Sequence, residues 1–180
     1  MSLKKLKLLS VIGIFIIAFP IHFIYDKFPN SIFSIFFPVN ESIWEHMKML
    51  FTCFIIWGFI EYAISQKFKL LYHNFIFSNF FSAIISIPIF LILYLPFHYT
   101  IGHNMIITLI IMLITFSIVE YLSFIILKTK EIRYINYISL ILIVISYIIF
   151  GYLTYHPIRQ DLFYDHEDNK YGTNIYILGN

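Results

Sequence analysis

Five long apolar segments constrain this chain more than any other feature of its sequence. They cover about residues 8–25, 44–65, 75–97, 104–127 and 134–155, and short stretches with charged residues, Pro or Gly separate them. A helix needs about 20 apolar residues to cross a bilayer core of roughly 30 Å. The sequence therefore predicts an all-α integral membrane protein with five transmembrane helices.

The composition agrees with this class and argues against several others. Of the 180 residues, 60% are hydrophobic and 12% are charged, whereas soluble domains carry about 25% charged residues. The net charge of +2 is too small to indicate a nucleic-acid partner. The lone Cys53 provides neither a disulfide framework nor a cysteine-based metal site. The expected partner is the lipid bilayer, with a homo-oligomer or an unidentified membrane partner left open.

Basic residues predict how the chain is oriented. Eight of the twelve Lys and Arg residues lie before the first segment, between the second and third, or between the fourth and fifth: Lys4, Lys5, Lys7, Lys67, Lys69, Lys128, Lys130 and Arg133. Because basic residues accumulate on the cytoplasmic side, this distribution predicts a multi-pass protein of the cell membrane with its N-terminus inside. The C-terminal tail, residues 156–180, is then extracellular. Its apolar side chains favour a tail that folds back over the outer ends of the helices.

The same topology gathers ionisable side chains at the outer ends of the segments. Six of the seven histidines fall there, namely His22, His46, His98, His103, His156 and His166. The acids Asp26, Glu41, Glu45, Asp161, Asp165, Glu167 and Asp168 fall there too. Ionisable groups at membrane depth are normally paired or functional, which favours a role for His22 and His46. A solvated position suits His166, in the polar stretch DHEDNK.

The densest polar stretch is PVNESIWEHMKML, residues 38–50, at the start of the second segment. Asn40 or Ser42 is the expected helix N-cap, because both side chains accept hydrogen bonds from free N–H groups in a first turn. Acids near a helix start also complement the positive end of the helix dipole. This capping chemistry explains part of the stretch without any function.

The remaining side chains of this stretch predict chemistry. Glu41 and Glu45 are spaced as like charges on one helix face, which favours a cation, a shared proton or a metal between them. Lys48 lies one turn deeper and is expected to pair with Glu45 or to extend towards water. His46 beside these acids is a candidate proton donor and acceptor.

Three short motifs carry a resemblance to a known family: IHFIY at 21–25, VNESIWEH at 39–46 with Lys48, and DLFYD at 161–165 followed by Tyr171 and Gly172. With them the chain resembles an uncharacterised family of small polytopic membrane proteins from Gram-positive bacteria, a domain of unknown function with a VNESxWEHxK motif. The resemblance implies no activity. It implies that His22, Asn40, Glu41, Trp44, Glu45, His46, Lys48, Asp165, Tyr171 and Gly172 belong to the family pattern. Arg159 and Gln160 depart from it, since apolar residues or proline are expected there.

The resulting hypothesis is a polar His/Glu site on the outer face. The favoured function is a membrane-embedded hydrolase or group transferase that acts on lipid or envelope substrates. In it, His46 is the general acid or base, Glu41 and Glu45 orient it or bind a metal, and Lys48, His22 and Asp165 complete the site. The alternatives are a subunit that binds or transports a cation or headgroup, and a structural membrane protein without catalysis.

A divalent metal such as zinc is the candidate cofactor. Zinc binds His nitrogens and carboxylate oxygens, and a catalytic site keeps one position open for water. The zincin spacing HExxH is absent, so any ligands must come from several helices. His22, His46 and His156 are the expected ligands.

Two further acids, Glu61 and Glu120, lie within the second and fourth segments towards the cytoplasmic side. They are expected either to share a proton or to extend towards the nearby bases Lys67, Lys69 and Lys128, and the second expectation is favoured.

The predicted orientation is testable by cysteine accessibility. In a chain with Cys53 replaced by Ala, we expect Lys27→Cys to react with a membrane-impermeant thiol reagent in intact cells. We expect Lys130→Cys to react only after the membrane is permeabilised, because that connection lies in the cytoplasm. Labelling of position 130 in intact cells would contradict the orientation.

Overall fold

Within the described residues, 1–70 and 72–173, the computed structural model has six α-helices and a small C-terminal hairpin. The helices are α1 (Leu3–Lys27), α2 (Ser31–Phe36), α3 (Ile43–Lys67), α4 (Phe75–Ile101), α5 (Met105–Leu127) and α6 (Ile135–Tyr155). A 3₁₀ turn, η1 (Asp161–Phe163), then leads into the antiparallel strands β1 (Tyr164–Asp165) and β2 (Lys170–Tyr171). Residues 174–180 of the predicted tail lie outside the described residues.

The prediction of five long apolar helices is confirmed. Each predicted segment forms one helix, and α1, α3, α4, α5 and α6 are long and apolar enough to cross a membrane. The short α2 between the first two was not predicted. Asn30 starts it, because its side chain accepts hydrogen bonds from the N–H groups of Ile32 and Phe33.

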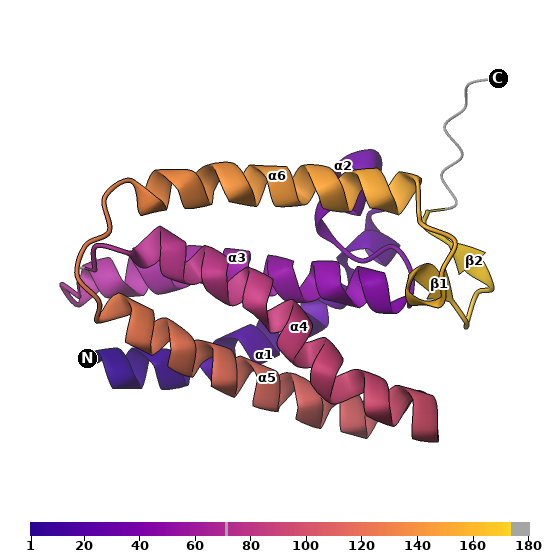
Figure 1. Ribbon diagram of the computed structural model, residues 1–180, viewed down its shortest axis with the longest axis horizontal. Helices are drawn as coiled ribbons and strands as arrows, with labels where there is room; N and C mark the ends of the chain where they lie inside the picture. Colours follow the sequence, from indigo (N-terminus) through magenta and orange to yellow (C-terminus); the bar gives the residue numbers. More distant parts are fainter. Residues whose placement is uncertain (71, 174–180) are drawn as a thin grey trace.

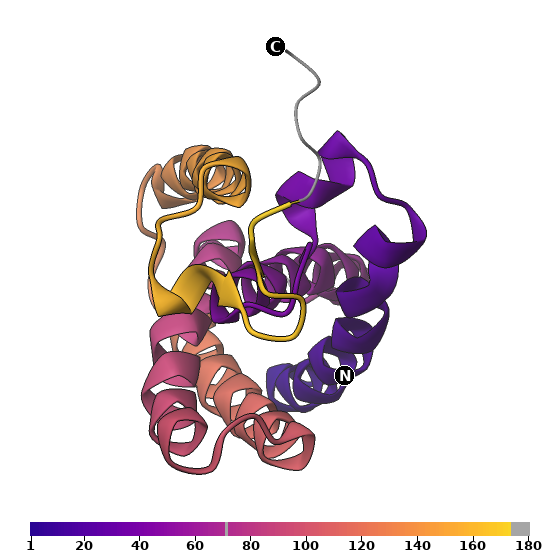
Figure 2. The same cartoon turned by 90° about the vertical axis from the view of Figure 1, so that its right-hand side faces the viewer.

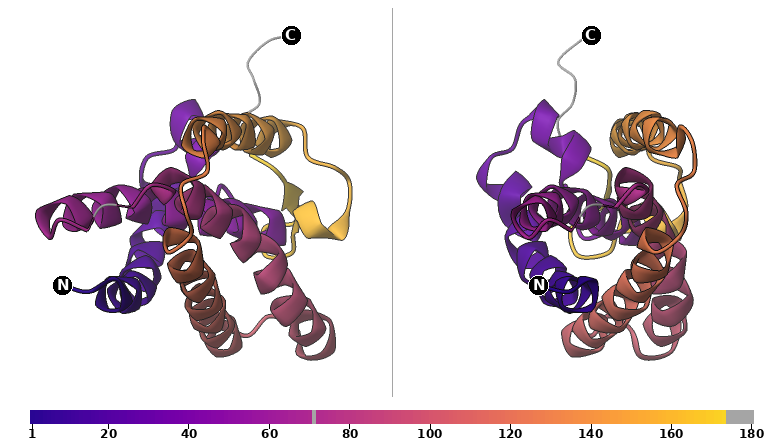
Figure 3. Two further views of the ribbon diagram at one scale, coloured as in Figure 1. Left: turned by 60° about the vertical axis from the view of Figure 1, so that its left-hand side comes forward. Right: turned by 90° about the vertical axis from the view of Figure 1, so that its left-hand side faces the viewer.

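Helix α3 runs through the middle of the bundle, with α6 on one side and α1 and α5 on the other (Figures 1 and 3). It is the least apolar of the five long helices, yet 67% of its most apolar 18-residue stretch is buried, against 17% for α6. A central helix that is mostly covered by protein can carry polar side chains on its buried faces, which a lipid-facing helix cannot.

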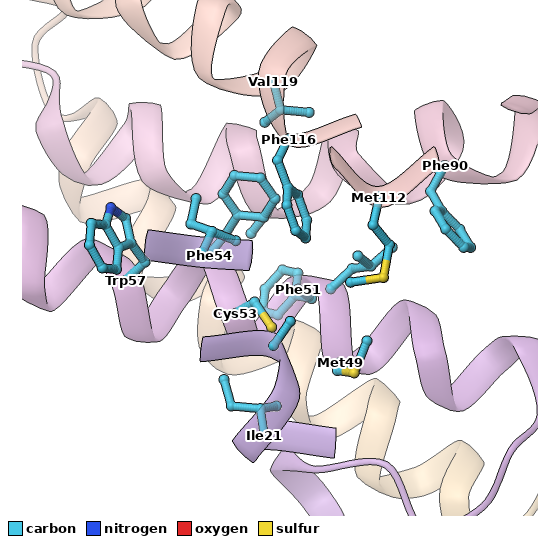
Figure 4. Close-up of a cluster of buried hydrophobic side chains, with 14 of the residues drawn as sticks. Ile21, Met49, Phe51, Cys53, Phe54, Trp57, Phe90, Met112, Phe116 and Val119 are labelled. Carbon is cyan, nitrogen blue, oxygen red and sulfur yellow. The ribbon is translucent and has the colours of Figure 1, made fainter. Parts of the chain in front are cut away.

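The apolar core forms where α3 meets its neighbours. Phe51, Cys53 and Phe54 of α3 are fully buried or nearly so, and Figure 4 shows them among side chains from α1, α4 and α5. The rings of Phe54 and Phe116 pack edge to face with centroids 5.6 Å apart. Because lipid tails are as apolar as these side chains, close packing rather than burial from water holds such helices together.

One glycine allows α1 to approach α3 closely. A Cβ atom on Gly13 would lie 1.9 Å from Cη2 of Trp57, so only glycine leaves room for the indole. Small residues at helix contacts are typical of membrane bundles, because they let the backbones come close.

The C-terminal segment lies across the end of the bundle where α1 ends and α3 begins, here called the tail end (Figure 2). Phe163 is buried and stacks on Trp44 with ring centroids 4.7 Å apart. The Asn40 side-chain amide donates to the carbonyl of Gly172 at 2.9 Å. Gly172 has φ +58°, and a Cβ there would lie 2.3 Å from the carbonyl oxygen of Thr154. Both the positive φ and the lack of space for a Cβ atom require glycine at this position.

At the opposite end, the favoured expectation for Glu61 and Glu120 is wrong. Neither side chain extends towards Lys67, Lys69 or Lys128; both are 3% exposed and contact the ammonium of Lys7. The sequence analysis treated Lys7 only as a topology signal, because helical spacing within α1 does not reveal which helices pack beside it.

The close contact at Gly13 predicts a specific loss of stability. Gly13→Ala should destabilise the protein by about 1–3 kcal/mol, because overpacking forces the Trp57 indole out of its place. We expect a lower melting temperature in detergent for this variant. Gly151→Ala is the matched control, since its Cβ would meet only the movable Ile35 side chain at 3.3 Å. Equal melting of the two variants would contradict the packing described.

Candidate functional site

Two histidines and a glutamate meet at the tail end, here called the His–Glu–His group: His22, Glu41 and His46. His22 lies near the end of α1, Glu41 in the connection before α3, and His46 in the first turn of α3. Each histidine Nε2 lies 3.5 Å from the same Glu41 oxygen, Oε2. One possible ligand atom from each residue lies within 4.8 Å of the other two. The three side chains therefore face a common point.

The start of α3 determines where these side chains lie. Ser42 is the N-cap, since its hydroxyl accepts from the N–H of Glu45 at 3.3 Å. Of the two predicted caps, Ser42 is thus the correct one, whereas the Asn40 side-chain oxygen accepts from the N–H of Ser42 at 2.9 Å. Because Glu41 precedes the helix, the prediction that it shares a helical face with Glu45 is wrong. The two carboxylates have different partners.

A backbone hydrogen bond fixes the tautomer of His46. Its Nδ1 lies 2.9 Å from the carbonyl oxygen of Ser42, and a carbonyl can only accept, so Nδ1 carries hydrogen. In the neutral ring, the lone pair of Nε2 then faces the Glu41 carboxylate. The Nε2 lone pair and the lone pairs of the carboxylate oxygen repel each other unless a proton or a metal ion lies between them. Metal-binding histidines commonly show this pattern, with the second ring nitrogen donating to a backbone carbonyl.

The tail holds Glu41 in position. Asp165 is fully buried, and its Oδ2 accepts from the N–H of Glu41 at 3.1 Å. Its Oδ1 accepts from the N–H groups of Glu167 and Asp168 at 2.8 and 3.1 Å. The structure therefore places Asp165 behind the backbone of Glu41 rather than among the converging ligand atoms.

The surroundings favour an ionised Glu41. The hydrogen bond from the His22 imidazole lowers the pKa of the Glu41 carboxyl; partial burial opposes this shift, and the charges of His46 and His103 add to it. The carboxyl group therefore stays ionised at a lower pH than an ordinary glutamate does, and the ionised form is the one that binds a cation.

Glu45 and Lys48 form a separate buried ion pair. Their side chains are 1% and 0% exposed, with Nζ 2.5 Å from Glu45 Oε2. Lys48 also donates to the carbonyl of Ser34 at 2.7 Å and to the hydroxyl of Thr154 at 2.9 Å. The second Glu45 oxygen accepts from that hydroxyl at 3.0 Å. The predicted pairing of the two residues is confirmed, and it joins α2, α3 and α6.

Two cavities border the His–Glu–His group. The larger, of about 300 Å³, has mainly apolar walls that include Phe19, Phe23, Met49, Met105, Leu109 and Met112. The smaller, of about 70 Å³, lies under the tail, and beside Ile43 and Phe90 its lining includes the polar side chains of Tyr94, His98, Asp161, Tyr164, His166 and Glu167. Glu41, His46, His103 and Thr108 line both.

The remaining histidines are not part of the group. His156 is exposed and stacks on Tyr152, so the expected ligand set of His22, His46 and His156 is not the one that converges. The reason is that His156 directly follows α6, and α6 lies on the opposite side of α3 from α1. His166 pairs with Asp161 at 2.8 Å instead of being merely solvated.

Sequence reasoning missed two residues of this region. The Tyr94 hydroxyl lies 3.2 Å from Nδ1 of His98 and 3.4 Å from Nδ1 of His103. Thr154 bridges Glu45 and Lys48. Both stand in apolar helices, where a tyrosine or threonine is too common to signal a site.

A family model described as "Family of unknown function (DUF6512)" matches residues 1–173. The chain belongs to this family, as its resemblance predicted, and the family description names no activity. No curated protein and no solved structure matches the chain.

The buried pair predicts strongly coupled substitutions. Glu45→Gln or Lys48→Met alone should destabilise the protein by about 3–5 kcal/mol, because each leaves one uncompensated buried charge. The double variant should lose less than the sum of the two, which melting temperatures in one detergent would reveal. Asp26→Asn, at an exposed acid, is the control. Additive losses would show that the charges do not depend on each other.

Proposed function

We propose that this member of the family is a metal-dependent hydrolase or group transferase of the cell membrane that acts on lipid or envelope substrates. In this proposal the N-terminus is cytoplasmic and the tail end faces outward. His22, Glu41 and His46 hold a divalent metal ion such as zinc.

The donor set supports a metal ion. Two imidazoles and one carboxylate are a ligand set of catalytic zinc sites, where three protein ligands leave a position open for water. Both Nε2 atoms and Glu41 Oε2 face one point, and a cation there removes the repulsion between the His46 lone pair and the carboxylate. When bound, such an ion lowers the pKa of a bound water and polarises a carbonyl or phosphoryl oxygen.

The two cavities support an amphiphilic substrate, and their meeting at the His–Glu–His group is the observation that carries the proposal. An apolar chain suits the larger cavity, whose walls are mainly Phe, Met and Leu side chains. A polar head suits the smaller cavity under the tail. The bond between head and chain would then lie beside the ligand atoms.

In this proposal the roles differ from those in the sequence hypothesis. His46 serves as a ligand, with Ser42 fixing its tautomer, and Asp165 positions Glu41 through the backbone. Glu45 and Lys48 form a separate ion pair that stabilises the start of α3. His103 lines both cavities and acts electrostatically on Glu41, so the proton-transfer role passes to His103.

Metal content of the purified protein tests the proposal. We expect about one zinc ion per chain in the wild type, and a loss of more than about tenfold in affinity for His22→Gln, Glu41→Gln and His46→Gln. His156→Gln is the matched control, because this histidine lies outside the group. Melting temperatures close to wild type would show that the loss is local.

Turnover separates the proposed enzyme from a binding subunit. Incubation with a total lipid extract, read by mass spectrometry, should give cleavage or transfer products in the wild type. Products should disappear in His103→Gln while the metal remains. Bound metal without any products would favour the cation- or headgroup-binding alternative. Absence of bound metal after zinc titration would overturn the proposal.

A further inference from the structure

Helix α1 begins at the end of the bundle opposite the tail (Figure 1). A second buried cluster of charges lies near this end. It consists of Lys7 of α1, Glu61 of α3 and Glu120 of α5, here called the Lys7 cluster. Lys7 Nζ lies 2.6 Å from Glu61 Oε1 and 3.1 Å from Glu120 Oε2. The three side chains are at most 8% exposed. One ammonium group thus contacts two carboxyl groups inside an apolar bundle.

The charges of this cluster do not balance. With all three groups ionised, one positive and two negative charges leave one negative charge buried. A further titratable side chain within electrostatic reach of Lys7 and Glu61 is Tyr72, from the connection between α3 and α4. A phenol adds no positive charge. Burying an unpaired carboxylate is so unfavourable that such groups take up a proton instead.

The surroundings supply hydroxyl groups but no compensating charge. Ser10 donates to Glu61 Oε2 at 3.0 Å. Helix α4 adds Ser78, Asn79 and Ser82 to the lining, and Ser78 bonds the Ser123 hydroxyl at 2.7 Å. All of these side chains are neutral.

An unpartnered hydroxyl points to a missing small ligand. Ser82 is 1% exposed, and its Oγ has no hydrogen-bond partner among the described residues. It lines a cavity of about 10 Å³ together with Lys7, Glu61 and Glu120. A cavity of about 10–15 Å³ with polar walls holds one water molecule. Such a water would satisfy Ser82 and connect it to the carboxyl groups.

We propose that the Lys7 cluster is a proton-binding site, in which Glu61 and Glu120 share one proton at neutral pH beside a water molecule at Ser82. A proton fits better than a metal cation, because the Lys7 ammonium already lies between the two carboxyl groups and repels a second cation. A proton adds the missing charge without requiring further space. This site does not depend on the His–Glu–His group.

Infrared spectroscopy of the detergent-purified protein tests the assignment. The wild type should show the carbonyl stretching band of a buried protonated carboxyl group at neutral pH. Glu61→Gln and Glu120→Gln should each remove the band, because either change leaves one Lys–Glu pair of zero net charge. The same reasoning predicts that both variants fold. Glu131→Gln, at an exposed acid in the connection between α5 and α6, should leave the band unchanged.

If both carboxyl groups are ionised, the wild type lacks the band at neutral pH, and the proposal is overturned. A band that survives in both Gln variants overturns it too, because the proton is then bound elsewhere. Lys7→Gln provides a further check, because without the ammonium both carboxyl groups must be protonated and the band should about double.

Discussion

The buried Glu45–Lys48 pair is the interaction on which the tail end of the molecule depends. Its two charges lie fully inside the protein, where they are tolerable only because each satisfies the other and the polar groups around them. Those groups belong to helices α2 and α6 and to the backbone of Val39. The pair therefore fixes how the start of α3 sits against α2 and α6, and with it the connection that carries Glu41.

The tail completes this arrangement from the other side. Asp165 binds the backbone of Glu41, while Asn40 binds the backbone of Gly172. These reciprocal contacts join the segment before α3 to the segment after α6, far apart in sequence. Asn40, Asp165 and Gly172 do not themselves face the His–Glu–His group. Such residues hold the backbone on which the converging side chains stand.

The two ends of the bundle handle buried charge in different ways. At the tail end, a fully compensated pair supports a partly open group of imidazoles and a carboxylate next to two cavities. At the N-terminal end, one ammonium faces two carboxyl groups beside a cavity the size of a water molecule. The first arrangement suits a ligand from outside the protein, and the second suits a proton. Both depend on α3, which carries polar side chains on faces that protein covers.

The sequence by itself determined the five long helices, since a run of apolar residues of membrane-spanning length admits few other structures. It also located the densest group of ionisable side chains, at residues 38–50, because such side chains are conspicuous in an apolar chain. Capping chemistry limited the helix start to Asn40 or Ser42, and helical spacing predicted the pairing of Lys48 with Glu45. Only the tertiary structure decided that Glu41 turns away from Glu45, that His156 stays apart from His22 and His46, and that Lys7 pairs with Glu61 and Glu120. These outcomes depend on which helices lie side by side, and apolar helices of similar composition carry almost no information about their neighbours.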